Sequence, residues 1–228
     1  EIETILYNRG YAAVVIGRII NPKSIAYNLK LNEFSVASNT NTLWNYNFHR
    51  VSGDVFKAVQ MAWNKTYEAG YRRIGTATLR HNPEVPNDQL RLAAVLERQN
   101  YYGDRIEKIT PYLGTPGDDK SLLEWFQYHK PDSVIGLHVG QYYLLRENIP
   151  ENQFKKLAFA SLIVIPKDKW SRTISGVIYQ EKEVAEVTIS LLDQEIRNRV
   201  HGIPTNIMSI NLSPKWRDGK TLFPKSEI

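Results

Sequence analysis

Apolar residues along this chain alternate between two spacings, one typical of a helix with a single buried face and one typical of a buried strand. From Val55 the buried-face positions recur every three or four residues, at Ala58, Val59, Ala62, Thr66 and Ala69, which predicts a helix. Gly70 predicts its end, because glycine readily adopts the left-handed conformation of a helix C-terminus. A short strand over residues 74–78 follows, so this segment has the order of one helix–strand step of a doubly wound sheet.

The rest of the chain repeats this alternation, which predicts an α/β fold with parallel sheets. Strands are predicted over residues 11–16, 34–37, 48–51, 105–111, 132–137, 157–162, 175–179 and 206–212. Helices are predicted over residues 25–29, 54–69, 89–101, 120–129, 141–146 and 181–199, and the first residues predict the last turns of another helix. Asn87 or Asp88 is the expected N-cap of the helix over 89–101. The expected buried face of the last helix consists of Ala185, Ile189, Leu192 and Ile196.

A break rich in proline and turn-forming residues over 81–88 divides the chain into two halves with similar patterns. The length of 228 residues also exceeds that of a typical single domain. We therefore expect two lobes. The first would consist of residues 1–80 with 181–200, and the second of residues 84–178 with 205–228.

Composition limits the classes of function. The net charge is +5, but the basic residues are scattered among 24 acidic ones, so charge alone does not predict a DNA-binding module. The absence of cysteine excludes disulfides and thiol catalysis and agrees with a reducing compartment. No apolar run approaches the ~20 residues of a membrane span, and no signal peptide is visible, so we expect a cytoplasmic chain with no membrane contact.

Catalytic motifs are missing from the sequence. It contains no Gly-x-Ser-x-Gly, phosphate-binding loop or His-Glu-x-x-His pattern, so we expect no catalytic residue and no cofactor. The adjacent carboxylates Asp118 and Asp119 are interpreted as a solvated helix start. No second His or carboxylate stands at ligand spacing from His138, so we expect no metal site.

Several segments carry a resemblance to a known family. The helix after Asp54 with Gly70-Tyr71-Arg72-Arg73-Ile74-Gly75 resembles the stretch "D…A…A…L…GHRRIG" of the LacI/GalR family, the sugar-sensing bacterial repressors. Further segments resemble, in the same order, the family patterns RGVDGIIV, PDAVFA, GIPEDVAVVGFDD, TTVRQPREEMG and the Gly-Ile-Pro tail. They are residues 7–17, 130–136, 148–162, 175–185 and 201–222.

The resemblance implies a fold, an activity and partners. The fold would be a periplasmic-binding-protein-like type I pair of Rossmann-like lobes, joined by three crossovers, with an effector in the cleft. The first lobe would be incomplete, and the helix-turn-helix headpiece that contacts operator DNA would be absent from this chain. A homodimer is expected, with contributions from the helix after Asp54 and from residues 133–146. The alternative is an extracytoplasmic solute-binding protein, which an upstream signal peptide would distinguish.

Three site residues match residues that the family uses. Arg91 matches the arginine that opens the first helix of the second lobe and hydrogen-bonds ligand hydroxyls, although a surface arginine would fit the same pattern. Asp54 matches an acidic acceptor at the edge of the cleft, and it could equally cap the following helix. Gln180 matches the glutamine at the last crossing. These roles follow from the resemblance.

Three further candidates depart from the family or stand outside its motifs. His138 lies where the family usually has Asn, and Ser161 lies where it usually has Asp, so acceptors typical of sugar binding are replaced. Both follow predicted strands, and ligands of open α/β sheets bind outside the carboxyl ends of strands. Trp170, after the strand over 157–162, could stack on a sugar ring or be a packed surface residue. The resemblance implies a small polar effector, a saccharide or sugar derivative, and the two replacements argue against a simple pentose or hexose.

Overall fold

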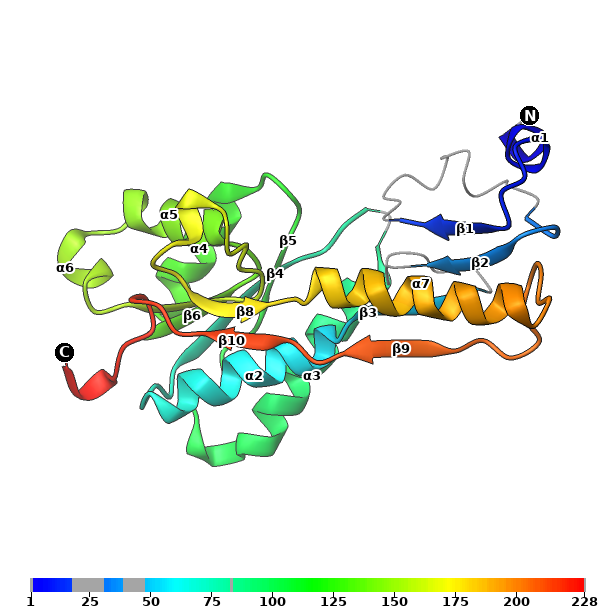
Figure 1. The fold of residues 1–228 in the computed structure, drawn as a ribbon. Coiled ribbons are helices and arrows are strands. Elements are labelled where there is room, and N and C mark those ends of the chain that lie inside the picture. The colour runs from blue at the N-terminus through cyan, green and yellow to red at the C-terminus, as the bar shows by residue number, and fades with distance from the viewer. Residues whose placement is uncertain (1, 18–30, 39–47, 83, 228) are drawn as a thin grey trace. The chain divides into compact units, whose positions relative to one another are not determined.

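The computed structural model describes residues 2–17, 31–38, 48–82 and 84–227. The predicted helix over 25–29 lies outside the described residues. The chain forms two compact units, each with its own sheet of mainly parallel strands (Figure 1). The smaller unit consists of Glu1–Asp54, Val85–Asn87 and Gln180–Leu212, and the larger one of Val55–Glu84, Asp88–Tyr179 and Ser213–Ile228.

The smaller unit contains a four-stranded parallel sheet in the order β1-β2-β3-β9. The strands are β1 (Ala13–Ile16), β2 (Ser35–Ser38), β3 (His49–Gly53) and β9 (Ser209–Leu212). Its helices are α1 (Ile2–Asn8) and α7 (Glu181–Arg197). Helix α7 runs along the sheet (Figure 1) and packs on it through Val184, Leu191 and Leu192, against Ala37 and Val51. Helix α7 is therefore part of the smaller unit.

The buried face of α7 differs from the predicted one. Ile189 is 59% exposed and Ile196 39% exposed, while Glu195 is 6% exposed. Glu195 is buried because its carboxylate contacts Nε2 of His49 on β3 at 2.8 Å. The other ring nitrogen of His49, Nδ1, accepts a hydrogen bond from the backbone N–H of Met208 at 2.9 Å. Because Nδ1 is an acceptor, the imidazole is neutral and Nε2 donates to the carboxylate, so a buried hydrogen bond acts together with the apolar contacts to fix the rotation of this helix on the sheet.

The larger unit contains a six-stranded sheet in the order β10-β8-β7-β6-β4-β5, parallel except for β10. The strands are β4 (Ile74–Leu79), β5 (Tyr112–Gly114), β6 (Ser133–Gly136), β7 (Ala158–Ser161), β8 (Ser175–Ile178) and β10 (Lys215–Arg217). The helices are α2 (Val55–Glu68), α3 (Pro86–Tyr102), α4 (Asp119–His129), α5 (Val139–Asn148) and α6 (Glu151–Phe154), with short 3-10 turns over Gly103–Arg105, Lys169–Ser171 and Lys225–Glu227.

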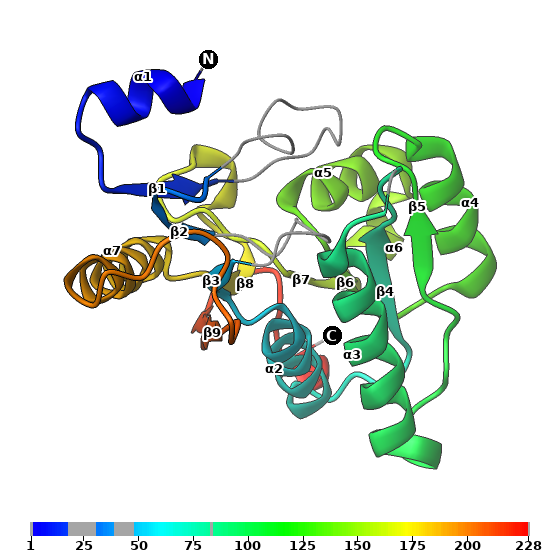
Figure 2. The same cartoon turned by 90° about the vertical axis from the view of Figure 1, so that its right-hand side faces the viewer.

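Helices cover both faces of this sheet, because successive strand residues point to opposite sides. On β6, Ile135 faces a core formed with α2 and α3, which includes Trp63. Its neighbour Val134 faces a second core formed with α4 and α5, which includes Phe126 and Leu145. Figure 2 shows the two helix pairs on opposite sides of the strands. The double burial explains why the strands have continuous apolar sequences.

The Gly-Tyr-Arg-Arg-Ile-Gly motif has a structural role in the larger unit. Gly70 has a φ of +99°, as predicted for the end of α2. The Arg72 guanidinium lies 3.7 Å from the ring centroid of Tyr67, and Arg73 donates to the backbone oxygen of Lys130 at 3.2 Å. A Cβ on Gly75 would lie 2.6 Å from Trp125, so the strand approaches α4 more closely than any other residue allows.

Several element and unit boundaries differ from those expected. Strand β4 pairs with β6 and β9 pairs with β3, so residues 55–80 belong with the larger sheet and 209–212 with the smaller one. Helix α3 begins at Pro86, where proline suits the first helical position, so Asp88 lies inside the first turn and does not cap it. The expected strand over 105–111 is absent from the described residues; the strand here is β5, residues 112–114. Among the described helices, none is both long and apolar enough to cross a bilayer.

Candidate functional site

The carboxyl ends of five parallel strands meet at one edge of the larger sheet, where ligands of open α/β sheets bind. A pocket of about 120 Å³ opens at this edge beside the ends of β4, β5 and β6. Strand residues Leu79 and Tyr112, the loop over 115–118, Asp119 and Leu122 of α4, and His138 and Gln141 line it. The side chains come from four separate segments of the sequence.

His138 precedes α5 and brings an imidazole to this pocket. The residue as a whole is exposed, but partial burial of its ring lowers its pKa, and the nearby Asp119 carboxylate opposes this effect only in part. The ring is therefore neutral at physiological pH and offers one donor and one acceptor nitrogen. Gln141 fixes the backbone beneath it, since its Oε1 accepts hydrogen bonds from the N–H groups of Leu137 at 2.6 Å and His138 at 3.4 Å.

Two carboxylates of the loop after β5 complete the pocket. Asp118 caps α4, and its Oδ1 accepts a hydrogen bond from Ser121 N at 3.2 Å. Hydrogen bonds from Ser121 lower the pKa of Asp118, so this side chain is charged at neutral pH. Asp119 is the first residue of α4. The interpretation of both residues as a helix start is confirmed, but they also line the pocket, which the sequence analysis did not predict.

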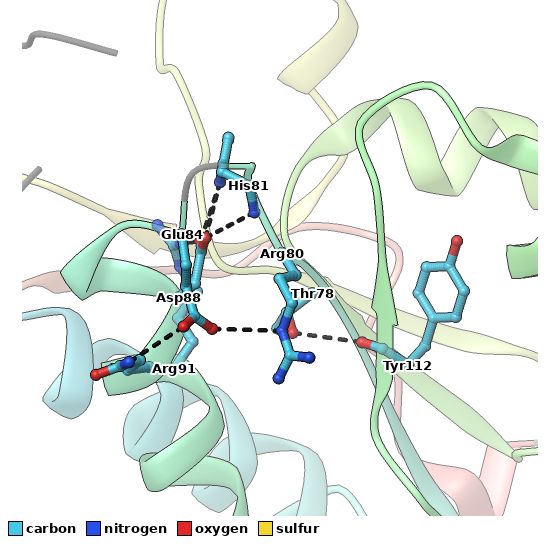
Figure 3. A network of polar contacts seen from close by, with 8 residues as sticks. Thr78, Arg80, His81, Glu84, Asp88, Arg91 and Tyr112 are labelled. Atoms are coloured by element: carbon cyan, nitrogen blue, oxygen red, sulfur yellow. Dashed lines mark hydrogen bonds and ion pairs between the residues drawn. The ribbon is translucent and has the colours of Figure 1, made fainter. Parts of the chain in front are cut away.

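Arg91 lies in the second turn of α3 and is 7% exposed. Its Nη1 donates to Oδ1 of Asp88 at 3.2 Å, and Asp88 is itself 4% exposed. The Asp88 carboxylate also accepts from the backbone N–H of His81 at 2.8 Å and contacts Nδ1 of that ring at 3.0 Å. Figure 3 shows Asp88 between the two residues. The guanidinium that the resemblance assigns to the ligand is thus held by a buried carboxylate.

Ser161, the last residue of β7, is 0% exposed. Its hydroxyl donates to the backbone oxygen of Ile163 at 2.8 Å and accepts from the N–H of the same residue at 3.2 Å. It therefore stabilises the turn after the strand. Ser161 is not among the residues that line the described pocket, and its ligand contact stays a prediction.

Trp170 lies in a 3-10 turn after β7 and is 55% exposed. Its ring packs edge-to-face on Tyr143 of α5, with 5.4 Å between the ring centroids. The Tyr143 hydroxyl donates to the backbone oxygen of Trp170 at 2.9 Å. The two residues form a fixed aromatic pair at the surface of the larger unit.

Asp54 and Gln180 belong to the smaller unit. Asp54 directly precedes α2, and its backbone N–H donates to the oxygen of Leu212 at 2.9 Å. Gln180 stands at the N-cap position of α7. Their contacts with an effector stay predictions. Among the residues that the structure describes, no group of three His, Asp or Glu side chains is placed to hold a metal ion.

The polar residues that surround His138 and Arg91 are not predicted by the sequence patterns. Asp88 was interpreted as a cap, while Tyr112 and Gln141 carried no motif. One signal was available, because the Thr-Pro-Gly-Asp-Asp turn at 115–119 follows the end of a parallel strand, where loops of an α/β sheet approach ligands. The partners within the pocket depend on how separate strands are ordered, and local patterns do not contain that information.

The fold is similar to that of solved transcription regulators. A LacI family transcriptional regulator from Enterococcus faecium, described with bound ribose, aligns with a TM-score of 0.69 over 96% of this chain and 82% of that chain, at 16% identity. The regulator CcpA of Lactococcus lactis gives 0.72 over 96% and 81%, at 13% identity. A complex of the regulator CelR with cellobiose gives 0.71 over 96% and 68%, at 13% identity.

These neighbours are transcription regulators and not enzymes. No protein-family profile matches the sequence, and no curated protein matches it. The chain has the periplasmic-binding-protein-like α/β fold of LacI-family regulators, as the sequence resemblance predicted.

Proposed function

We propose that this chain is the ligand-sensing domain of a LacI/GalR-type transcriptional regulator and that its signal is a small saccharide-like effector. The fold carries the proposal, because 96% of the chain aligns with regulators of this family. Two of those regulators are described with a bound sugar, ribose in one and cellobiose in the other. The proposal assigns operator binding to a helix-turn-helix headpiece outside these 228 residues.

The pocket at the carboxyl edge of the larger sheet supports an effector that forms hydrogen bonds. Its polar side chains include the imidazole of His138 and the carboxylates of Asp118 and Asp119, which suit hydroxyl groups. In this proposal Arg91 and Asp88 form a fixed donor–acceptor pair near the end of β4. An effector acts on such a domain only through a difference in its affinity for two conformations of the protein.

Titration calorimetry with a panel of pentoses, hexoses and disaccharides tests the proposal. We expect saturable binding at one site, weakened up to about tenfold in His138→Ala, since a net hydrogen bond contributes about 0.5–1.5 kcal/mol. His201→Ala, at an exposed histidine of the smaller unit, is the control and should bind with unchanged affinity. If no saccharide of the panel binds, the proposed function is wrong.

We further propose that the chain forms a homodimer to which the Tyr143–Trp170 pair contributes. Exposed aromatic residues are enriched at protein interfaces, and Tyr143 lies in the segment over 133–146 that the resemblance assigns to the dimer. Sedimentation velocity should detect a dimer that Trp170→Ala weakens. Calorimetry on the same variant separates this role from ligand stacking, because a stacking residue would lower saccharide affinity. A monomer at every concentration would contradict the dimer.

A further inference from the structure

The pocket beside β4, β5 and β6 has an unbalanced charge. Asp118 and Asp119 line it, and both are exposed at its rim. Among the described residues of the lining, none is Lys or Arg, and His138 is neutral at physiological pH because burial lowers its pKa. The next residue of the chain, Lys120, has its Nζ 3.7 Å from Oε1 of Glu124. Its charge also contributes to the lowered pKa of Asp118, so it offsets part of the negative charge of the two aspartates.

The arginines at the end of β4 do not supply a net positive charge either. Arg91 is paired with Asp88 at 3.2 Å, and Arg80 with Glu84 at 3.3 Å (Figure 3). Each guanidinium therefore has a carboxylate beside it, which cancels most of its field beyond the pair. The local excess at this edge is that of the two aspartates.

Side chains of the protein already accept hydrogen bonds at the two helix ends that line the pocket. A helix N-terminus attracts an anion through backbone N–H groups that lack a partner within the helix. At α4 the N–H of Ser121 donates to Asp118. Directly before α5 the N–H groups of Leu137 and His138 donate to Oε1 of Gln141. These three N–H groups are therefore already used by side-chain acceptors of the protein.

We propose that this pocket binds the protonated amine of an amino-bearing saccharide and disfavours saccharides that carry a carboxylate or a phosphate. The inference rests on the proposed function and deepens it. An ammonium group donates up to three hydrogen bonds, which the carboxylates and the neutral imidazole accept. The pocket volume of about 120 Å³ is small beside the ~300–1,000 Å³ of a pocket that encloses a drug-sized ligand. It holds one substituent of the effector and not the whole molecule.

Calorimetry at neutral pH and low ionic strength tests this selectivity. The probes are matched sets from the gluco, galacto and manno series, each with an amino sugar, its uncharged N-acetyl form, the neutral hexose and the uronic acid. In the set that binds, we expect the amino sugar to bind roughly fivefold tighter than the neutral hexose and the uronic acid at least fivefold weaker, because an exposed ion pair contributes about 0.2–1 kcal/mol. High salt should reduce these ratios.

Two variants test whether the preference for the amino sugar over the neutral hexose arises in this pocket. Asp119→Asn should bring the amino sugar and the neutral hexose to within about twofold of each other, since one carboxylate next to the amine is removed. Glu147→Gln makes the same change in charge at an exposed position near the end of α5, outside the lining, and should leave the ratio unchanged.

The outcomes are distinguishable. A uronic acid that binds as tightly as the neutral hexose, or an amine preference that Asp119→Asn leaves intact, overturns the inference while the saccharide function stands. If none of the twelve probes (four in each of three series) binds while a pentose or a disaccharide of the first panel does, only this inference is overturned. If no saccharide of either set binds, both the proposed function and this inference are overturned.

Discussion

Replacing His49 by leucine is expected to lower the free energy of unfolding by about 3–5 kcal/mol at neutral pH, because it leaves the buried Glu195 carboxylate without its partner. The two side chains are 6% and 8% exposed, so water cannot replace the lost hydrogen bond. The N–H of Met208 loses its acceptor as well. Urea unfolding followed by far-UV circular dichroism measures the change.

The loss of unfolding free energy caused by His49→Leu, called the deficit below, should depend on pH with a defined sign. Burial raises the pKa of Glu195 in the folded chain above its usual value, and removal of the His49 donor should raise it further. A raised folded pKa contributes stability that is present at low pH and is lost as pH rises. Burial also lowers the pKa of His49, so the parent chain itself loses stability as pH falls through the titration of His49, which changes the deficit in the same direction. The deficit should therefore be largest at neutral pH and shrink as pH falls through the pKa of Glu195. A deficit that does not change with pH would contradict the assignment.

The double variant His49→Leu/Glu195→Leu is the control. Two apolar residues of similar volume replace a buried ion pair with little cost in other proteins, so most of the lost stability should return. If the double variant is as unstable as His49→Leu, the loss comes from packing and not from the stranded carboxylate.

Gly176→Ala is expected to destabilise the larger unit by about 3 kcal/mol, at the upper end of the range for overpacked interiors. A Cβ on this residue of β8 would lie 2.2 Å from the backbone oxygen of Ser161 and 2.8 Å from the side chain of Val164. Backbone atoms cannot rotate away, so β7 and β8 have to separate. The midpoint of urea unfolding measures the effect.

Gly103→Ala separates this clash from the general effect of adding a methyl group to glycine. Gly103 has a φ of +53° and nothing within 4 Å of its Cβ position, so only the strain of a left-handed alanine applies, about 1–2 kcal/mol. A Gly176→Ala chain more stable than Gly103→Ala would show that β7 and β8 adapt to the methyl group.

The sequence predicted the elements whose apolar spacing decides their structure. Helix α2 and strands β4, β6 and β7 lie where the pattern placed them, because each buries a regular face. Two predictions were wrong: the helix predicted over 89–101 begins earlier, at Pro86, and the strand predicted over 105–111 is replaced by β5 at residues 112–114. Proline is compatible with a first helical turn, and residues over 106–111 bury apolar side chains such as Ile109 without pairing as a strand.

Burial of charge explains the remaining errors. An apolar pattern cannot predict that Glu195 turns inward, because the reason lies on a strand about 146 residues earlier, at His49. For the same reason the sequence did not predict the role of Asp88. Its carboxylate is buried because it accepts hydrogen bonds from His81 and Arg91. Single candidates such as His138 could be found from their place after a strand, but their neighbours could not.

The order of the segments of the two units along the sequence has a consequence for folding during synthesis. The five parallel strands of the larger sheet are complete by residue 178, whereas the smaller sheet needs α7 and β9, which end at residues 197 and 212. During translation the larger unit can therefore bury both faces of its sheet before α7, the helix that packs on β2 and β3, has been synthesised. Until then the apolar residues Ala37 and Val51, which pack against α7 in the folded chain, are exposed to other chains and to chaperones. A ribosome that stalls before β9 therefore leaves the smaller unit open to aggregation.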